Sequence, residues 1–155
     1  MYHINIIAIG KNKDAWIEQG IEHYLTLLKK SARVSLIIIP DIKNSKNLST
    51  EELKKEEARQ LQKSLKSGYR VALSDRGRQT TSENFAVVLQ QMMSHSDGCD
   101  FIIGGIYGLD DSIMQSAQLI LSLSPMTMSH RLIRPVLLEQ LYRAFSIISG
   151  GQYHK

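Results

Sequence analysis

Runs of β-branched, apolar residues alternate along this chain with segments of helical periodicity, and this alternation restricts the fold more than any other feature. Strands are expected at residues 2–9, 33–39, 69–73, 100–103 and 126–128. Helices are expected at residues 14–30, 49–68, 82–92, 110–121 and 132–148. Each parallel strand pair needs a crossover, which is usually a helix. The sequence therefore predicts one α/β domain over residues 1–155, with a mostly parallel sheet and helices on both faces.

Local signals add detail to these elements. Ser49 and Glu52 have the spacing of a capping box, in which each side chain bonds the other residue's backbone amide. Residues 75–77 (Asp-Arg-Gly) predict a turn after the third strand. Trp16 is expected on the inward face of the first helix. Pro135 fits the last helix only in its first turn, where a missing amide costs no hydrogen bond.

Composition limits the function classes without selecting one. The net charge of +4 favours an anionic partner such as nucleic acid, although it also serves solubility. The one cysteine, Cys99, allows no internal disulfide and fits a reducing compartment. No apolar run approaches the roughly 20 residues of a membrane helix, and residues 1–9 resemble a strand rather than a signal peptide. The histidines lack metal-ligand spacing, so we expect no metal site. Together with the single cysteine and the lack of a membrane segment, this indicates a cytoplasmic protein.

Ligands of parallel sheets bind at the carboxyl ends of the strands, here residues 73–76, 103–108 and 124–130. Gly104, Gly105 and Gly108 follow the fourth strand. Adjacent glycines let a backbone approach a ligand closely, but they also make an ordinary tight turn. Their spacing matches neither the dinucleotide-binding nor the phosphate-loop pattern, so a cofactor held by its phosphates is disfavoured.

The stretch from Leu123 to His130 mixes hydroxyl and apolar side chains and is too interrupted for a helix. An adenosine has a flat apolar face and a hydrogen-bonding edge, so a loop of this composition suits it. The alternative is a plain loop that leads into the last helix. Composition leaves these two interpretations open.

The last helix and the residues after it carry a second group of reactive side chains. Glu139 and Arg143 lie one helical turn apart, next to Tyr142. A guanidinium beside a tyrosine suits a phosphate-bearing substrate, although the same spacing gives an ordinary Glu–Arg pair. Beyond two glycines, residues 153–155 (Tyr-His-Lys) can stack on a base, transfer a proton and meet a phosphate. A frayed, disordered end is the alternative.

Four patterns in order give the chain a resemblance to one family. They are Ile103-Gly-Gly-x-x-Gly-Leu109, Leu123-Ser-x-Met-Thr-x-x-His130, Leu141-Tyr-Arg-Ala-Phe145 and Tyr153-His-Lys155. The chain resembles, over its whole length, the bacterial large-subunit ribosomal RNA pseudouridine N3-methyltransferases of the SPOUT class. Ile106 and Ser129 stand where that family often has proline, which affects the expected shape of the loops more than their chemistry.

The resemblance implies a C-terminal trefoil knot, S-adenosyl-L-methionine as cofactor, a homodimer with sites at its interface, and ribosomal RNA within the assembled ribosome as substrate. The implied cofactor-binding residues are Leu73, Gly105, Ser124, Pro125, Met126, Thr127, Met128 and Ser129. The implied catalytic residues are His130, Arg143, Tyr153 and His154, with either histidine as the proton acceptor. Two alternatives are a non-catalytic module that binds RNA or the ribosome, and a SPOUT enzyme with another RNA target.

Overall fold

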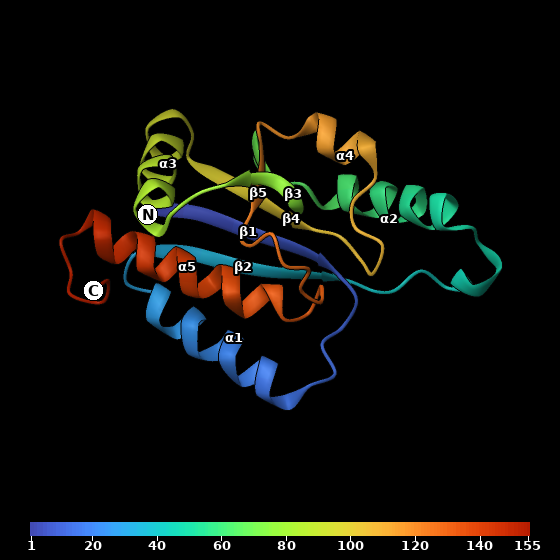
Figure 1. Cartoon of the computed structure of the whole chain (residues 1–155), viewed down its shortest axis with the longest axis horizontal. Helices are drawn as coiled ribbons and strands as arrows, with labels where there is room; N and C mark the ends of the chain where they lie inside the picture. Colours follow the sequence, from blue (N-terminus) through green and yellow to red (C-terminus); the bar gives the residue numbers. More distant parts are fainter.

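A five-stranded sheet runs through the computed structural model, which describes residues 1–155 (Figure 1). Its strands are β1 (Tyr2–Ile9), β2 (Ala32–Ile39), β3 (Tyr69–Gln79), β4 (Gly98–Ile103) and β5 (Leu119–Ser122). The strand order is β2-β1-β4-β3-β5, and every neighbouring pair is parallel. The parallel α/β sheet expected from the sequence is confirmed.

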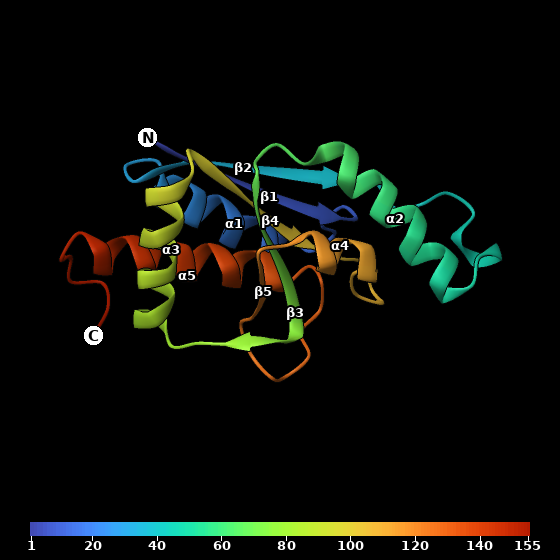
Figure 2. The ribbon, with the colours of Figure 1, turned by 90° about the horizontal axis from the view of Figure 1, so that it is seen from above.

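Helices cover both faces of this sheet (Figures 1 and 2). They are α1 (Ala15–Leu28), the short 3-10 helix η1 (Ser45–Asn47), α2 (Thr50–Ser64), α3 (Ser82–His95), α4 (Asp111–Ser116) and α5 (Ile133–Ile148). Helices α1, α3 and α5 pack in one layer, whereas α2 and α4 pack on the opposite face. No helix combines the length and the hydropathy that a membrane crossing requires.

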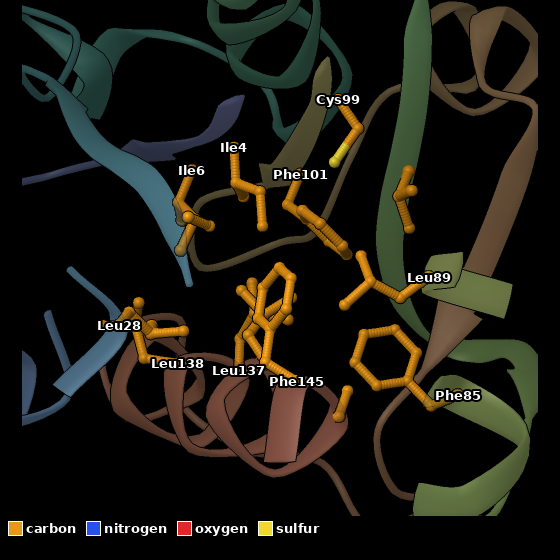
Figure 3. Packing of buried hydrophobic residues seen from close by; sticks show 14 of the residues in the cluster. Ile4, Ile6, Leu28, Phe85, Leu89, Cys99, Phe101, Leu137, Leu138 and Phe145 are labelled. Atoms are coloured by element: carbon orange, nitrogen blue, oxygen red, sulfur yellow. The ribbon is translucent and has the colours of Figure 1, made fainter. Parts of the chain in front are cut away.

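Alternation along the central strand β1 supplies both apolar layers. Ile4 and Ile6 face the layer of α1, α3 and α5, and Ile7 and Ile9 face α2 and α4. The larger layer is shown in Figure 3, where Phe101 of β4 lies between the sheet and α5. Strand β4 is buried along its whole length, as expected for a strand covered on both faces. The rigid sheet that results fixes the carboxyl ends of β1, β3 and β4.

Two of the local expectations are confirmed. Ser49 accepts a hydrogen bond from the amide of Glu52 at 3.2 Å, and the Glu52 carboxylate accepts one from the amide of Ser49 at 2.8 Å. Pro135 is the third residue of α5, within the first turn. Helix α2 therefore begins at a capping box. In α5 the missing amide hydrogen of Pro135 costs no helical hydrogen bond.

The helix expected at residues 110–121 is present but ends earlier, and the strand expected at 126–128 is wrong. The helix stops at Ser116, and residues 119–122 form β5, which pairs with β3. A short apolar run fits either periodicity, and here the free edge of β3 provides backbone partners. Residues 126–128 belong to a loop instead.

Two smaller expectations are also wrong. Residues 75–77 form no turn, because β3 continues to Gln79 through a register shift between Leu73 and Arg78. A Cβ at Gly77 would lie 2.7 Å from the backbone of Leu121, so β5 passes β3 too closely for any side chain there. Trp16 is 63% exposed, because α1 turns its Ile17 and Ile21 face to the core.

Candidate active site

The second half of β3, the end of β4 and the loops after β4 and β5 line a cavity of about 870 Å³ at the carboxyl edge of the sheet. Residues 73–76 at β3, residues 103–109 after β4 and the loop from Leu123 to Arg131 provide most of its wall. These are the strand ends where the sequence predicts a ligand. Of the eight predicted cofactor-binding residues, all except Pro125 line this cavity.

A second hollow, of about 590 Å³, lies near the amino ends of β1 and β4 and is lined almost entirely by polar residues. The buried Asp100 carboxylate beside it accepts hydrogen bonds from the amides of Lys66 and Ser67 and from the Asn5 side chain. The buried carboxylate and its three donors satisfy one another, so they stabilise the fold. We therefore assign the functional site to the carboxyl edge.

Each of the three glycines after β4 has its own reason for lacking a side chain. A Cβ at Gly104 would lie 2.6 Å from the Gly108 backbone, and a Cβ at Gly105 would lie 2.6 Å from a carboxylate oxygen of Glu57. Gly108 has a φ of +82°, and its amide donates to the Gly105 carbonyl at 3.1 Å. The segment is thus a tight turn, and the same turn also lines the cavity.

Hydroxyl groups hold the loop from Leu123 to Arg131 in place. Ser124 Oγ accepts from the amide of Met126 at 3.0 Å, and Ser129 Oγ accepts from the amide of Leu132 at 3.1 Å. Thr127 Oγ1 donates to a carboxylate oxygen of Asp75 at 3.1 Å and so ties the loop to β3. Several of the hydroxyls therefore shape the loop.

His130 lies at the edge of the cavity, where α5 begins. The fully buried Arg134 donates from Nε to the His130 carbonyl at 3.1 Å and from Nη2 to the Ile9 carbonyl at 2.7 Å. These bonds fix the loop to the end of β1. Burial of the imidazole and the positive charges of Arg134 and Arg131 lower the pKa of His130. The neutral ring, which can accept a proton, is therefore favoured near pH 7.

The residues after α5 fold back onto that helix. Arg143 donates to one oxygen of Glu139 from Nη2 at 2.6 Å and from Nε at 3.0 Å, and Tyr153 donates to the same oxygen at 3.2 Å. The Arg143 guanidinium lies 4.7 Å from the centre of the Tyr153 ring. His154 contacts Arg143 Nη1 at 3.3 Å and Glu83 of α3 at 2.9 Å. We call Glu83, Glu139, Arg143, Tyr153 and His154 the tail cluster.

Two contributions to the tail cluster are not evident from the sequence. Glu139 was recognised only as a partner for Arg143, although it also holds Tyr153. Glu83 was not singled out, because it is 71 residues from His154 in the chain and no local pattern connects them. The second part of the site therefore depends on a tertiary contact between α3 and the tail.

The tail cluster lies away from the cavity within one chain. None of Arg143, Tyr153 and His154 lines the cavity, whereas His130 does. Helix α5 begins three residues after His130, and at 1.5 Å per residue the helix carries Arg143 about 15 Å beyond its first residue, Ile133. One chain alone therefore does not bring the four predicted catalytic residues together. No group of three or more His, Cys, Asp or Glu side chains is placed to hold a metal ion.

Comparison with known proteins identifies the family of this chain. The family model described as "Predicted SPOUT methyltransferase" matches residues 2–154. The chain belongs to the SPOUT methyltransferase family. Two curated relatives of this SPOUT methyltransferase are named ribosomal RNA large subunit methyltransferase H, from Bacillus thuringiensis (strain Al Hakam) and Bacillus cereus (strain B4264). Each is 42% identical over 158 residues, which cover 99% of this chain and 99% of the relative.

Solved structures agree on the fold. A methylase family protein from Haemophilus influenzae Rd KW20 superposes with a TM-score of 0.58 at 12% identity, covering 98% of this SPOUT methyltransferase and 70% of the other chain. A methylase family protein from Neisseria gonorrhoeae superposes with a TM-score of 0.53 at 12% identity, covering 99% of this chain and 85% of the other. The SPOUT fold and the family resemblance are confirmed, while the trefoil knot stays a prediction from the family.

Proposed function

We propose that this SPOUT methyltransferase transfers a methyl group from S-adenosylmethionine to N3 of a pseudouridine in large-subunit ribosomal RNA, on the assembled ribosome in the bacterial cytoplasm. The observation that carries the proposal is the 42% identity, over 99% of both chains, to proteins named ribosomal RNA large subunit methyltransferase H. The mild positive charge of the chain is consistent with an RNA substrate.

The cavity at the carboxyl edge fits the proposed cofactor. Its volume of about 870 Å³ lies in the range of small-molecule sites. Leu73 and Met128 offer apolar surface to an adenine ring, and the Asp75 carboxylate offers a counter-charge to a cationic methyl donor. Gly104 and Gly105 have no side chains, so a ligand can reach their backbone. When bound, S-adenosylmethionine supplies an electrophilic methyl group on a positively charged sulfur.

The chain's own residues fit the remaining requirements of the reaction. N3 of a uracil-type base carries a proton at neutral pH and must lose it before it can attack a methyl group. His130, with its lowered pKa, is our proton acceptor. Arg143 stabilises the anion that develops on the base or holds the adjacent phosphate. Tyr153 stacks on the base or positions it, and His154 orients it.

We propose a homodimer because the predicted catalytic residues are separated in one chain. An interface that places the tail cluster of one subunit at the cavity of its partner completes the site. The order of the tail cluster supports this arrangement, since Arg143, Tyr153 and His154 already hold one another in place before any RNA binds. A pre-organised cluster loses little conformational entropy when the substrate arrives.

We expect Arg143→Ala to slow methylation about a hundred-fold, because one donor to a developing anion contributes roughly that factor. The measurement is methyl incorporation into ribosomes from a strain that lacks the modification, with mass spectrometry of the digested RNA. Arg59→Ala, which removes an exposed arginine of α2, is the matched control and should keep the wild-type rate.

Three results would contradict the proposal in different ways. Full activity of Arg143→Ala would remove the assigned role of that residue. A methyl group found on a ribose 2′-hydroxyl would indicate another RNA target. Failure of the wild-type protein to bind S-adenosylhomocysteine at high micromolar concentration, measured by calorimetry, would favour a non-catalytic module.

A further inference from the structure

A buried carboxylate of α2 lies against the glycine turn of the cavity. Glu57 is only 6% exposed, and its helix neighbours Ala58 and Leu61 pack into the apolar layer beneath the sheet. Burial of a carboxylate costs free energy unless hydrogen bonds compensate for the lost water. The nearby Asp41 carboxylate adds repulsion, and together with burial it raises the pKa of Glu57. An acidic side chain at this position therefore needs a specific partner.

The partner is the backbone of Gly105. A Cβ built on Gly105 would lie 2.6 Å from Oε1 of Glu57 and 3.0 Å from Oε2, so the carboxylate occupies the space that a side chain would take. Hydrogen bonding from the Gly105 backbone lowers the pKa of this carboxylate and so partly offsets the effect of burial on the Glu57 pKa. Glycine and glutamate at these two positions thus depend on each other.

This contact fixes more than one atom of the turn. A trans peptide is planar, and its N–H and C=O groups point in opposite directions. An amide of Gly105 held by Glu57 therefore also fixes the direction of the Gly104 carbonyl. Both glycines line the cavity. Without Glu57 this peptide can rotate, since glycine has few steric barriers to other backbone angles.

We propose that Glu57 is a positioning residue that holds the Gly104–Gly105 peptide in the orientation required for cofactor binding. The inference rests on the proposed function, because it takes the cavity to be the S-adenosylmethionine site. The role needs a hydrogen-bond acceptor at the full length of a glutamate side chain, and it does not need the negative charge. Substitutions that separate length from charge can test it.

The test measures binding of S-adenosylhomocysteine by calorimetry in four variants. Glu57→Gln keeps an acceptor at the same reach and should bind within about three-fold of wild type. Glu57→Asp keeps the charge but is one methylene shorter, and Glu57→Ala has no acceptor. Both should bind about ten-fold more weakly, as expected for one lost hydrogen bond to a charged group. Glu56→Ala, at the neighbouring and more exposed position, is the control for lost charge and should bind as wild type.

Steady-state methylation gives a second readout. In Glu57→Asp the KM for S-adenosylmethionine should rise by the same factor of about ten, whereas the KM for the ribosomal substrate should not change. A purely structural role would instead lower the fraction of folded enzyme and leave both KM values alone. Thermal melting of each variant distinguishes lost folding from lost affinity.

Equal affinity of wild type and Glu57→Asp would overturn the inference and leave the proposed function intact. Weak binding by Glu57→Gln would also overturn it, because the charge rather than the acceptor would then matter. If the shorter variants do not fold, Gly105→Ala replaces them, since its Cβ pushes the carboxylate away, and unchanged affinity there would overturn the inference. A wild-type protein that binds no S-adenosylhomocysteine would overturn the proposed function and the inference with it.

Discussion

His130 and His154 carry the same imidazole, but their surroundings suit them to different tasks. His130 is half-buried at the cavity, and its ring nitrogens have no protein hydrogen bond. His154 is held between Arg143 and Glu83. A proton acceptor must be neutral and must reach the substrate, whereas a side chain held between two charged groups is better suited to orientation. The surroundings therefore favour His130 as the acceptor, a choice that residue type alone left open.

The pH dependence of methylation tests this choice. The pKa of His130 is lowered, mainly by burial, so its neutral form persists to more acidic pH than that of an ordinary histidine with a pKa near 6.5. The wild-type rate should therefore stay level through neutral pH and fall only below about pH 6.5. His130→Gln should lower the rate about a hundred-fold and abolish this acidic fall.

The control for this measurement is His95→Gln, which changes an exposed histidine at the end of α3 and should leave the profile unchanged. An acidic fall that persists in His130→Gln but disappears in His154→Gln would transfer the acceptor role to His154.

At the scale of elements, α5 links the cavity to the tail cluster. Its first residue lines the cavity, and its last turns carry Arg143 and support the tail. Gly150, with a φ of +70°, ends the helix, and the amide of Gly151 donates to the Ser146 carbonyl at 2.7 Å. The amide of Tyr153 then reaches Ser146 Oγ at 3.3 Å. These bonds make the two glycines a defined turn.

A variant truncated after Gly151 tests the role of this element. It removes residues 152–155, which contribute no residue to the buried core, so the melting temperature should change little. Methylation should fall at least about a hundred-fold, because the groups that orient the base are gone. Binding of S-adenosylhomocysteine should persist, because every residue that lines the cavity within the chain is retained.

Gln152→Ala is the matched control for the truncation and should keep most of the activity, since Gln152 is exposed and lies outside the tail cluster. A truncated protein that methylates ribosomes at the wild-type rate would show that the tail has no part in the reaction.

Across the whole molecule, the features that could be predicted from the sequence are those that depend on local patterns. Alternating periodicities gave the parallel sheet, and the strand ends gave the position of the cavity. The fifth strand was misplaced, because residues 119–122 fit a helix or a strand until the free edge of β3 is known. The contacts of Glu57 with Gly105 and of Glu83 with His154 could not be predicted, because each joins segments far apart in the chain. Local sequence patterns do not reveal such tertiary contacts.

The separation of His130 from the tail cluster makes one prediction about the assembled molecule. His130→Gln impairs the cavity half of the proposed site, and Arg143→Ala impairs the tail half. If each site combines a cavity from one subunit with a tail from its partner, a mixed dimer of the two variants contains one intact site and one doubly damaged site. Random mixing should then restore about a quarter of the wild-type rate per subunit, because half of the dimers are mixed.

The mixture must be allowed to exchange subunits, and mass measurement in solution should confirm that mixed dimers form. The matched control mixes His130→Gln with the double variant His130→Gln/Arg143→Ala, in which no cavity is intact and no activity can return. A mixture of the two single variants that forms mixed dimers and stays as inactive as its components would contradict a shared site. All four residues would then have to act within one chain, and α5 or the tail would have to move to bring the tail cluster to His130.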